Sequence, residues 1–127
     1  MLTNNHFLMK KTLVFGASTN PERASFQAVQ RLRHNGHFVV AVGAKEGKIN
    51  EEKILTGTPV IKNIHTITLY MGAKNQKNYY DYLLNLKPQR IIFNPGAENP
   101  ELSEIAAKQG IETIDACTLV MLSVGNY

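Results

Sequence analysis

Short apolar segments recur along the chain, separated by longer segments in which apolar residues return every three to four positions. Continuous apolar runs of about five residues predict strands buried on both faces, because a half-exposed strand would alternate apolar and polar residues. One segment, HTITLYMG, does alternate as a strand should. The predicted strands span residues 11–16, 37–43, 65–72, 90–94 and 110–116.

The segments between these strands carry helical spacing. In residues 20–36, small or apolar residues at i, i+3, i+4 and i+7 define one buried face: Ser25, Ala28, Val29 and Leu32. Asn20 is predicted to cap this helix, with Pro21 at its first position, and Asn99 and Pro100 repeat the device before a later helix. Residues 75–87 predict a third helix, and residues 118–125 a short apolar helix or turn.

Strands that alternate with amphipathic helices indicate a parallel sheet with helices on both faces. The charge-dense segment 44–59 is predicted to be a loop, followed by a short strand near Val60. We therefore expect one α/β domain of the Rossmann-like, doubly wound class, with about five strands in the order 3-2-1-4-5. Residues 1–9 are expected to be an N-terminal extension and residues 10–127 the domain.

Composition narrows the class of protein. Hydrophobic residues make up 43% of the 127 residues and charged residues 19%, which excludes a disordered chain. A single cysteine excludes a disulfide scaffold and favours a reducing compartment. No apolar run approaches the roughly 20 residues of a membrane helix. The expected location is the cytoplasm, and the net charge of +4 suits a small anionic ligand.

The loop after the first strand carries the strongest candidate chemistry. Gly16 permits a tight turn, and the small residues Ala17 and Ser18 let backbone N–H groups approach a ligand. Side chains of Ser18, Thr19 and Asn20 add donors, and the positive end of the next helix favours a phosphate. Arg23, in the first turn of that helix, is placed to pair with the phosphate. The loop lacks the later glycines of the usual dinucleotide fingerprint.

The end of the second strand indicates which nucleotide is bound. Sites for NAD place a carboxylate there to hold the ribose hydroxyl. This chain has Val42, Gly43, Ala44 and Lys45 instead, with Lys48 in the following loop. Lysines suit a phosphorylated ribose, so the sequence favours coenzyme A or NADP over NAD.

Five segments in this order resemble a known family. They are GASTNPERAS, HNGHFVVAVG, ILTGTPVI, FNPGAENPEL and GIETIDACTLVM. Over residues 10–122 the chain resembles the small stand-alone CoA-binding proteins of Rossmann type, which are similar to the CoA-binding domain of succinyl-CoA synthetase. The resemblance implies coenzyme A, or an acyl-CoA, as the cofactor.

The resemblance also implies roles for individual positions. The loop that holds the pyrophosphate is matched by Gly16, Ala17, Ser18, Asn20 and Arg23. The strand end that lines the adenosine part is matched by Val42, Gly43 and Lys45. Met71 and Gly72 match the strand tip that flanks the cleft, and Asn94, Pro95 and Gly96 match the loop where the pantetheine arm leaves.

The leading hypothesis is non-catalytic binding of coenzyme A or acyl-CoA. One rival is an NADP-dependent reductase or a CoA-ligase-related enzyme, although no histidine or carboxylate pair forms an evident catalytic set. Another is a regulatory module that has lost its ligand, which Met71 and Asn94 favour because the family often has other residues there. Ala116 also stands where the family commonly has an arginine. Cys117 is predicted to be structural, and the histidines lack metal-ligand spacing. We expect no nucleic-acid or membrane partner; a homodimer or a partner enzyme stays open.

Overall fold

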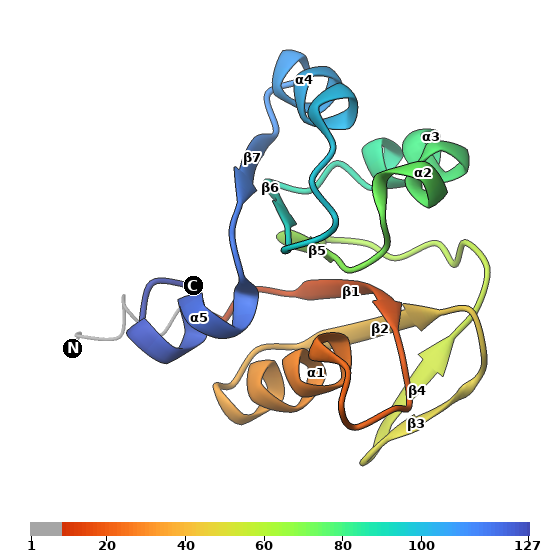
Figure 1. The fold of residues 1–127 in the computed structure, drawn as a ribbon, viewed down its shortest axis with the longest axis vertical. Helices are drawn as coiled ribbons and strands as arrows, with labels where there is room; N and C mark the ends of the chain where they lie inside the picture. The colour runs from red at the N-terminus through yellow and green to blue at the C-terminus, as the bar shows by residue number, and fades with distance from the viewer. Residues whose placement is uncertain (1–8) are drawn as a thin grey trace.

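The computed structural model describes residues 9–127, which form one seven-stranded sheet (Figure 1). The strands follow the order β3-β4-β2-β1-β5-β6-β7, and every neighbouring pair is parallel except β3 and β4. The strands are β1 (Thr12–Ala17), β2 (Val39–Gly43), β3 (Gly47–Ile49), β4 (Glu52–Leu55), β5 (Thr66–Leu69), β6 (Arg90–Phe93) and β7 (Glu112–Asp115). Of the predicted extension, only Met9 is among the described residues, and it is exposed.

The predictions of five strands and of the order 3-2-1-4-5 are wrong at one edge of the sheet. Segment 44–59 was expected to be a loop, but it forms the hairpin β3–β4, and no strand lies at 60–61. Its apolar residues Ile49 and Ile54 are buried on one face of the hairpin, whereas Lys48 and Lys53 are exposed and paired on the other face. Counted along the chain, the six parallel strands lie in the order 3-2-1-4-5-6, with β4 as the third strand.

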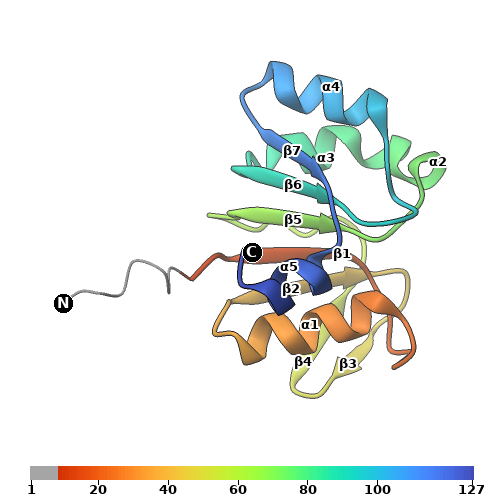
Figure 2. The same ribbon diagram turned by 60° about the vertical axis from the view of Figure 1, so that its left-hand side comes forward.

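Helices cover both faces of the sheet (Figure 2). One face carries α1 (Ala24–His34) and α5 (Thr118–Val124), and the other carries α3 (Tyr80–Asn85) and α4 (Pro100–Lys108). The helix predicted over 75–87 is divided into α2 (Ala73–Gln76), the 3-10 turn η2 (Lys77–Tyr79) and α3. No helix among the described residues is long and apolar enough to cross a membrane.

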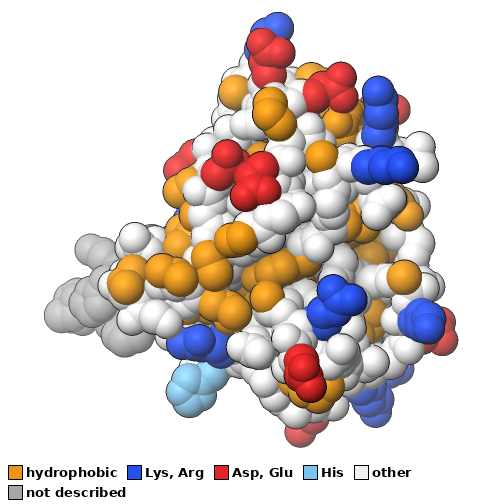
Figure 3. Space-filling model, viewed as in Figure 1, with side chains coloured by type: hydrophobic (Ala, Val, Ile, Leu, Met, Phe, Trp, Pro, Cys, Tyr) orange, Lys and Arg blue, Asp and Glu red, His pale blue; other side chains and the backbone are white. Residues whose placement is uncertain are grey.

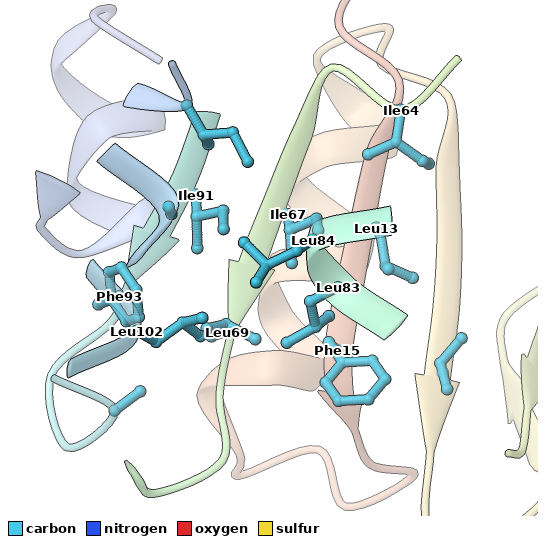
Figure 4. Close-up of a cluster of buried hydrophobic side chains, with 14 residues drawn as sticks. Leu13, Phe15, Ile64, Ile67, Leu69, Leu83, Leu84, Ile91, Phe93 and Leu102 are labelled. Carbon is cyan, nitrogen blue, oxygen red and sulfur yellow. The ribbon is translucent and has the colours of Figure 1, made fainter. Parts of the chain in front are cut away.

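The core consists of two apolar clusters, one on each face of the sheet. The α1 side includes the predicted helix face, since Ser25, Ala28, Val29 and Leu32 are all buried. The other side packs β-strand residues such as Phe15 and Phe93 against α3 and α4 (Figure 4). Burial of one such side chain contributes roughly 1.5–3 kcal/mol to the free energy of unfolding. This packing holds the strand ends, and the loops that follow them, in fixed positions.

Candidate functional site

A cleft opens at the carboxyl ends of β1 and β5, where the strand order reverses. Ligands of open parallel sheets bind at this point. The cleft has a volume of about 670 Å³, and a second cavity of about 290 Å³ shares Gly16, Ala44, Met71 and Tyr79 with it. In Figure 2, the β1–α1 loop and α2 flank this end of the sheet. The larger cavity is lined by Gly16, Ala17, Ser18, Arg23, Ala24, Ser25, Ala44, Tyr70, Met71, Lys74, Asn75, Asn78, Tyr79 and Pro95.

Two glycines make the floor of the cleft possible. Gly16 has φ of +102°, a conformation that side chains rarely adopt, and a Cβ there would lie 3.3 Å from backbone atoms of Tyr70 and Met71. A Cβ on Gly43 would overlap the carbonyl oxygen of Ala17. The backbones of β1, β2 and β5 can therefore converge only with glycine at these two positions.

The N-terminus of α1 faces the cleft without a side-chain cap. The predicted cap at Asn20 is wrong: its Oδ1 accepts from the N–H of Glu22 at 3.0 Å, in a turn before the helix. The helix begins at Ala24, with Arg23 in the N-cap position and no side-chain hydrogen bond there. The N–H groups of Ala24 and Ser25 are left without an intrahelical acceptor, and both residues line the cleft. Unpaired N–H groups at a helix N-terminus are donors for an anion.

The charge of the cleft is positive. Arg23 and Lys74 line it from opposite walls, and no carboxylate is among its lining residues. Arg23 is exposed, so its guanidinium is free to move toward a ligand. Two cations and the uncapped helix end make the cleft suited to a phosphorylated ligand.

A buried amide fixes the wall opposite α1. Gln76 is fully buried, and its Nε2 donates to the carbonyl oxygens of Met71 and Ala97, both at 2.8 Å. Its Oε1 accepts from Asn99 Nδ2 at 2.8 Å. One side chain therefore joins the segment after β5 to the loop after β6, and these two segments present Met71 and Pro95 to the cleft.

Comparison with known proteins identifies the family. The family model described as a CoA binding domain matches residues 10–123. This chain belongs to the CoA-binding domain family. An uncharacterized protein of known crystal structure is 47% identical, with a TM-score of 0.92 over 94% of this chain and 99% of that chain. No curated protein matches.

More distant structures share the fold of this CoA-binding domain. A protein from Thermus thermophilus is 20% identical with a TM-score of 0.83, over 92% of this chain and 90% of that chain. A hypothetical protein from Pyrococcus horikoshii OT3 is 21% identical with a TM-score of 0.82, over 97% of this chain and 92% of that chain. At these identities the likeness shows the fold alone.

Eight of the fourteen predicted site residues line the two cavities of the CoA-binding domain. They are Gly16, Ala17, Ser18, Arg23, Met71 and Pro95 in the larger cavity, and Val42 and Gly43 in the smaller. Residues from four separate strand ends, those of β1, β2, β5 and β6, are thus brought together.

The other six predicted residues do not line either cavity. Asn94 is buried; its Nδ2 donates to Thr68 Oγ1 and the carbonyl of Leu69, and its Oδ1 accepts from the N–H of Thr118. This side chain connects strands to α5 and leaves Pro95 to face the cleft. Thr19 lies against Gly47, and Lys45 is exposed beside Ala44. The remaining three are Asn20, Gly72 and Gly96.

Several lining residues were missed because tertiary packing alone places them. The Tyr79 ring packs edge-on against Phe15, with centroids 5.1 Å apart, and it also lines both cavities. Tyr70 lines the larger cavity, and burial raises its pKa to about 12, so it stays neutral near pH 7. Lys74 lies in α2 and Asn78 in η2, and both reach the cleft because the segment after β5 is placed beside β1.

The groups considered for catalysis lie outside the cleft. Cys117 is partly buried at the start of α5 and does not line the cleft. Among residues 9–127, no group of three or more His, Cys, Asp or Glu side chains is placed to hold a metal ion.

Proposed function

We propose that the chain binds coenzyme A or an acyl-CoA in this cleft and does not itself transform it. The observation that supports this most strongly is the end of α1, where two free backbone N–H groups and Arg23 converge on a cleft without carboxylates. A pyrophosphate is the part of coenzyme A that such donors stabilise. The family to which the chain belongs supports the same ligand.

The cleft offers space for the remaining parts of the ligand. The smaller cavity, between Val42, Gly43 and Gly57, suits the adenosine part, because it is walled by an apolar side chain and open backbone. Met71 and Pro95 lie at the other side of the phosphate position and suit the pantetheine arm. Lys45 is exposed near the adenosine end, so we expect it to meet the phosphorylated ribose from outside the cavity.

Thermal unfolding in the presence of nucleotides tests the proposal. A ligand that binds only the native state stabilises it by RT ln(1 + [L]/Kd). We expect coenzyme A and acetyl-CoA to raise the melting temperature most, dephospho-CoA to raise it less, and NAD to have no effect. Stabilisation by NADP beyond that by coenzyme A would instead support a reductase-like function.

Labelling and substitution of Cys117, the only thiol of the chain, test whether the protein is catalytic. We expect Cys117 to react slowly with Ellman's reagent in the native protein, and Cys117→Ser to retain coenzyme A binding. Acyl-CoA hydrolysis that disappears in Cys117→Ser would show that the protein is an enzyme.

A further inference from the structure

Helix α5 lies at the surface of the molecule but contains no charged residue. Its inner side carries Thr118 and Met121, which are buried. Its outer side carries Val120 and Val124, which are 57% and 65% exposed. A surface helix usually has a charged or polar outer side, whereas a helix that is apolar all round is typical of a buried position. The outer side of α5 is therefore built for contact with another surface.

The two exposed valines of α5 form one patch. They are four residues apart on the same helix, so their side chains are neighbours, with Cβ atoms about 5–6 Å apart. In the space-filling view, hydrophobic side chains form a band over α5 (Figure 3). Adjacent exposed apolar side chains with charged residues around them are typical of an interaction site.

Opposite charges lie on the two sides of this band. In Figure 3, acidic side chains lie above the band and basic side chains lie below it. Arg31 of α1 borders α5 on the basic side, because its Nη2 donates to Ser123 Oγ at 2.9 Å. The acidic residue nearest to α5 in sequence is Asp115, which ends β7 and is exposed.

The charged groups beside the band have no ion-pair partner within one copy of the chain. Among the residues that the structure describes, the only ion pair joins Arg33 and Glu52. Arg31 and Asp115 are therefore both available to groups of opposite charge on another molecule.

This arrangement selects a second copy of the chain as the occupant. A two-fold axis that runs along the band places the acidic side of each copy against the basic side of the other, so the same surface is complementary to itself. We propose that two copies associate through the outer side of α5. Val120 and Val124 of the two copies pack together, and Arg31 of each copy pairs with Asp115 of the other. A contact centred on one short helix buries less than the roughly 1,200 Å² of a stable interface, so the dimer dissociates on dilution.

Sedimentation equilibrium of the full chain, at concentrations up to about 1 mM, tests the proposal. We expect a reversible equilibrium between monomer and dimer. Val120→Gln with Val124→Gln should raise the Kd of the dimer by at least about tenfold, because each apolar contact is lost twice in a two-fold dimer. Val60→Gln is the matched control: Val60 is 88% exposed between β4 and β5, and the same change there should leave the Kd unchanged.

Exchange of the two charges tests the two-fold arrangement. Arg31→Glu and Asp115→Lys should each raise the Kd about fivefold, because each change brings like charges together. The double variant should regain the parent's Kd, because opposite charges face each other again. Unfolding by urea is measured for every variant to show that it folds. A parent chain that stays monomeric, a dimer that the valine variant does not weaken, or a double variant as weak as the single ones would overturn the proposal.

Discussion

The tripeptide Asn-Pro-Glu occurs twice, at residues 20–22 and 99–101, and the two copies form different structures. Asn99 caps α4, since its Oδ1 accepts from the N–H of Leu102 at 3.1 Å. Its Nδ2 also donates to the buried Gln76. Asn20 instead closes an exposed turn, and α1 begins only at Ala24.

The two copies of the tripeptide contribute to different properties: the copy at Asn99 to stability, and the copy at Asn20 to ligand binding. At Asn99 the helix end is satisfied and buried, and it secures the wall of the cleft. The Asn20 side chain accepts a hydrogen bond within the preceding turn and does not cap α1. The N-terminus of α1 therefore keeps unsatisfied N–H groups for a ligand. A helix terminus whose N–H groups have no partner in the protein marks a binding site more reliably than the capping motif before it.

The largest expected effect comes from Asn99→Ala. This change removes a helix cap, worth about 1 kcal/mol, and leaves the Oε1 of Gln76 buried without a donor, which costs about 1–3 kcal/mol. The free energy of unfolding, measured with urea, should fall by about 2–4 kcal/mol in total. The matched variant Asn20→Ala, in an exposed turn, should lose only about 0.5 kcal/mol. Equal losses would show that the two motifs are equivalent after all.

The second effect concerns the ligand. Arg23→Ala should weaken coenzyme A binding by about 1.5–3 kcal/mol, as for a lost hydrogen bond to a charged group, and should change stability little. Calorimetric titration measures it, with Lys108→Ala as the control because that lysine lies at the end of α4, away from the cleft. Unchanged affinity in Arg23→Ala would place the phosphates elsewhere.

A smaller effect is expected from Arg23→Ser, which would give α1 a side-chain N-cap as Asn99 gives α4. Serine is a good N-cap and alanine a poor one, so Arg23→Ser should be more stable than Arg23→Ala by about 1 kcal/mol without ligand. Both variants should bind coenzyme A more weakly than the parent. If serine instead restored binding, the positive charge of Arg23 would not be what holds the ligand.

The smallest effect is pH-dependent and lies at the amino ends of the strands, where His37 precedes β2. Burial, with Lys10 and Arg90 nearby, lowers the pKa of His37, whose Nδ1 accepts from the N–H of Lys10 at 3.0 Å. Because the folded-state pKa lies below the unfolded one, the stability that neutral His37 contributes is complete above about pH 6.5 and is lost as pH falls through the folded-state pKa. The melting temperature should therefore decrease between about pH 7 and pH 5.

His37→Gln should make that decrease smaller, although His65, whose pKa is lowered too, retains part of it. Coenzyme A affinity should change with pH only through titration of the ligand's own groups, since neither histidine lines the cleft. An affinity that changed with the protonation of His37 would contradict the separation between the amino and carboxyl ends of the strands.

The sequence by itself determined the class of fold, the buried face of α1 and the strand ends that meet at the cleft. These depend on local spacing: helical or strand periodicity, and a glycine at each tight turn such as Gly16. The capping interaction of Asn99 was also predictable, because a side-chain cap acts within a few residues.

Only the tertiary structure decided the edge of the sheet, the start of α1 and half of the cleft wall. Segment 44–59 becomes the hairpin β3–β4 because β4 pairs with β2 and because Ile49 and Ile54 are buried in the core cluster that includes α1. Tyr79 and Lys74 reach the cleft because β5 lies beside β1 rather than beside β2. Such positions depend on the balance of long-range packing, which outweighs the local preferences that a single sequence displays.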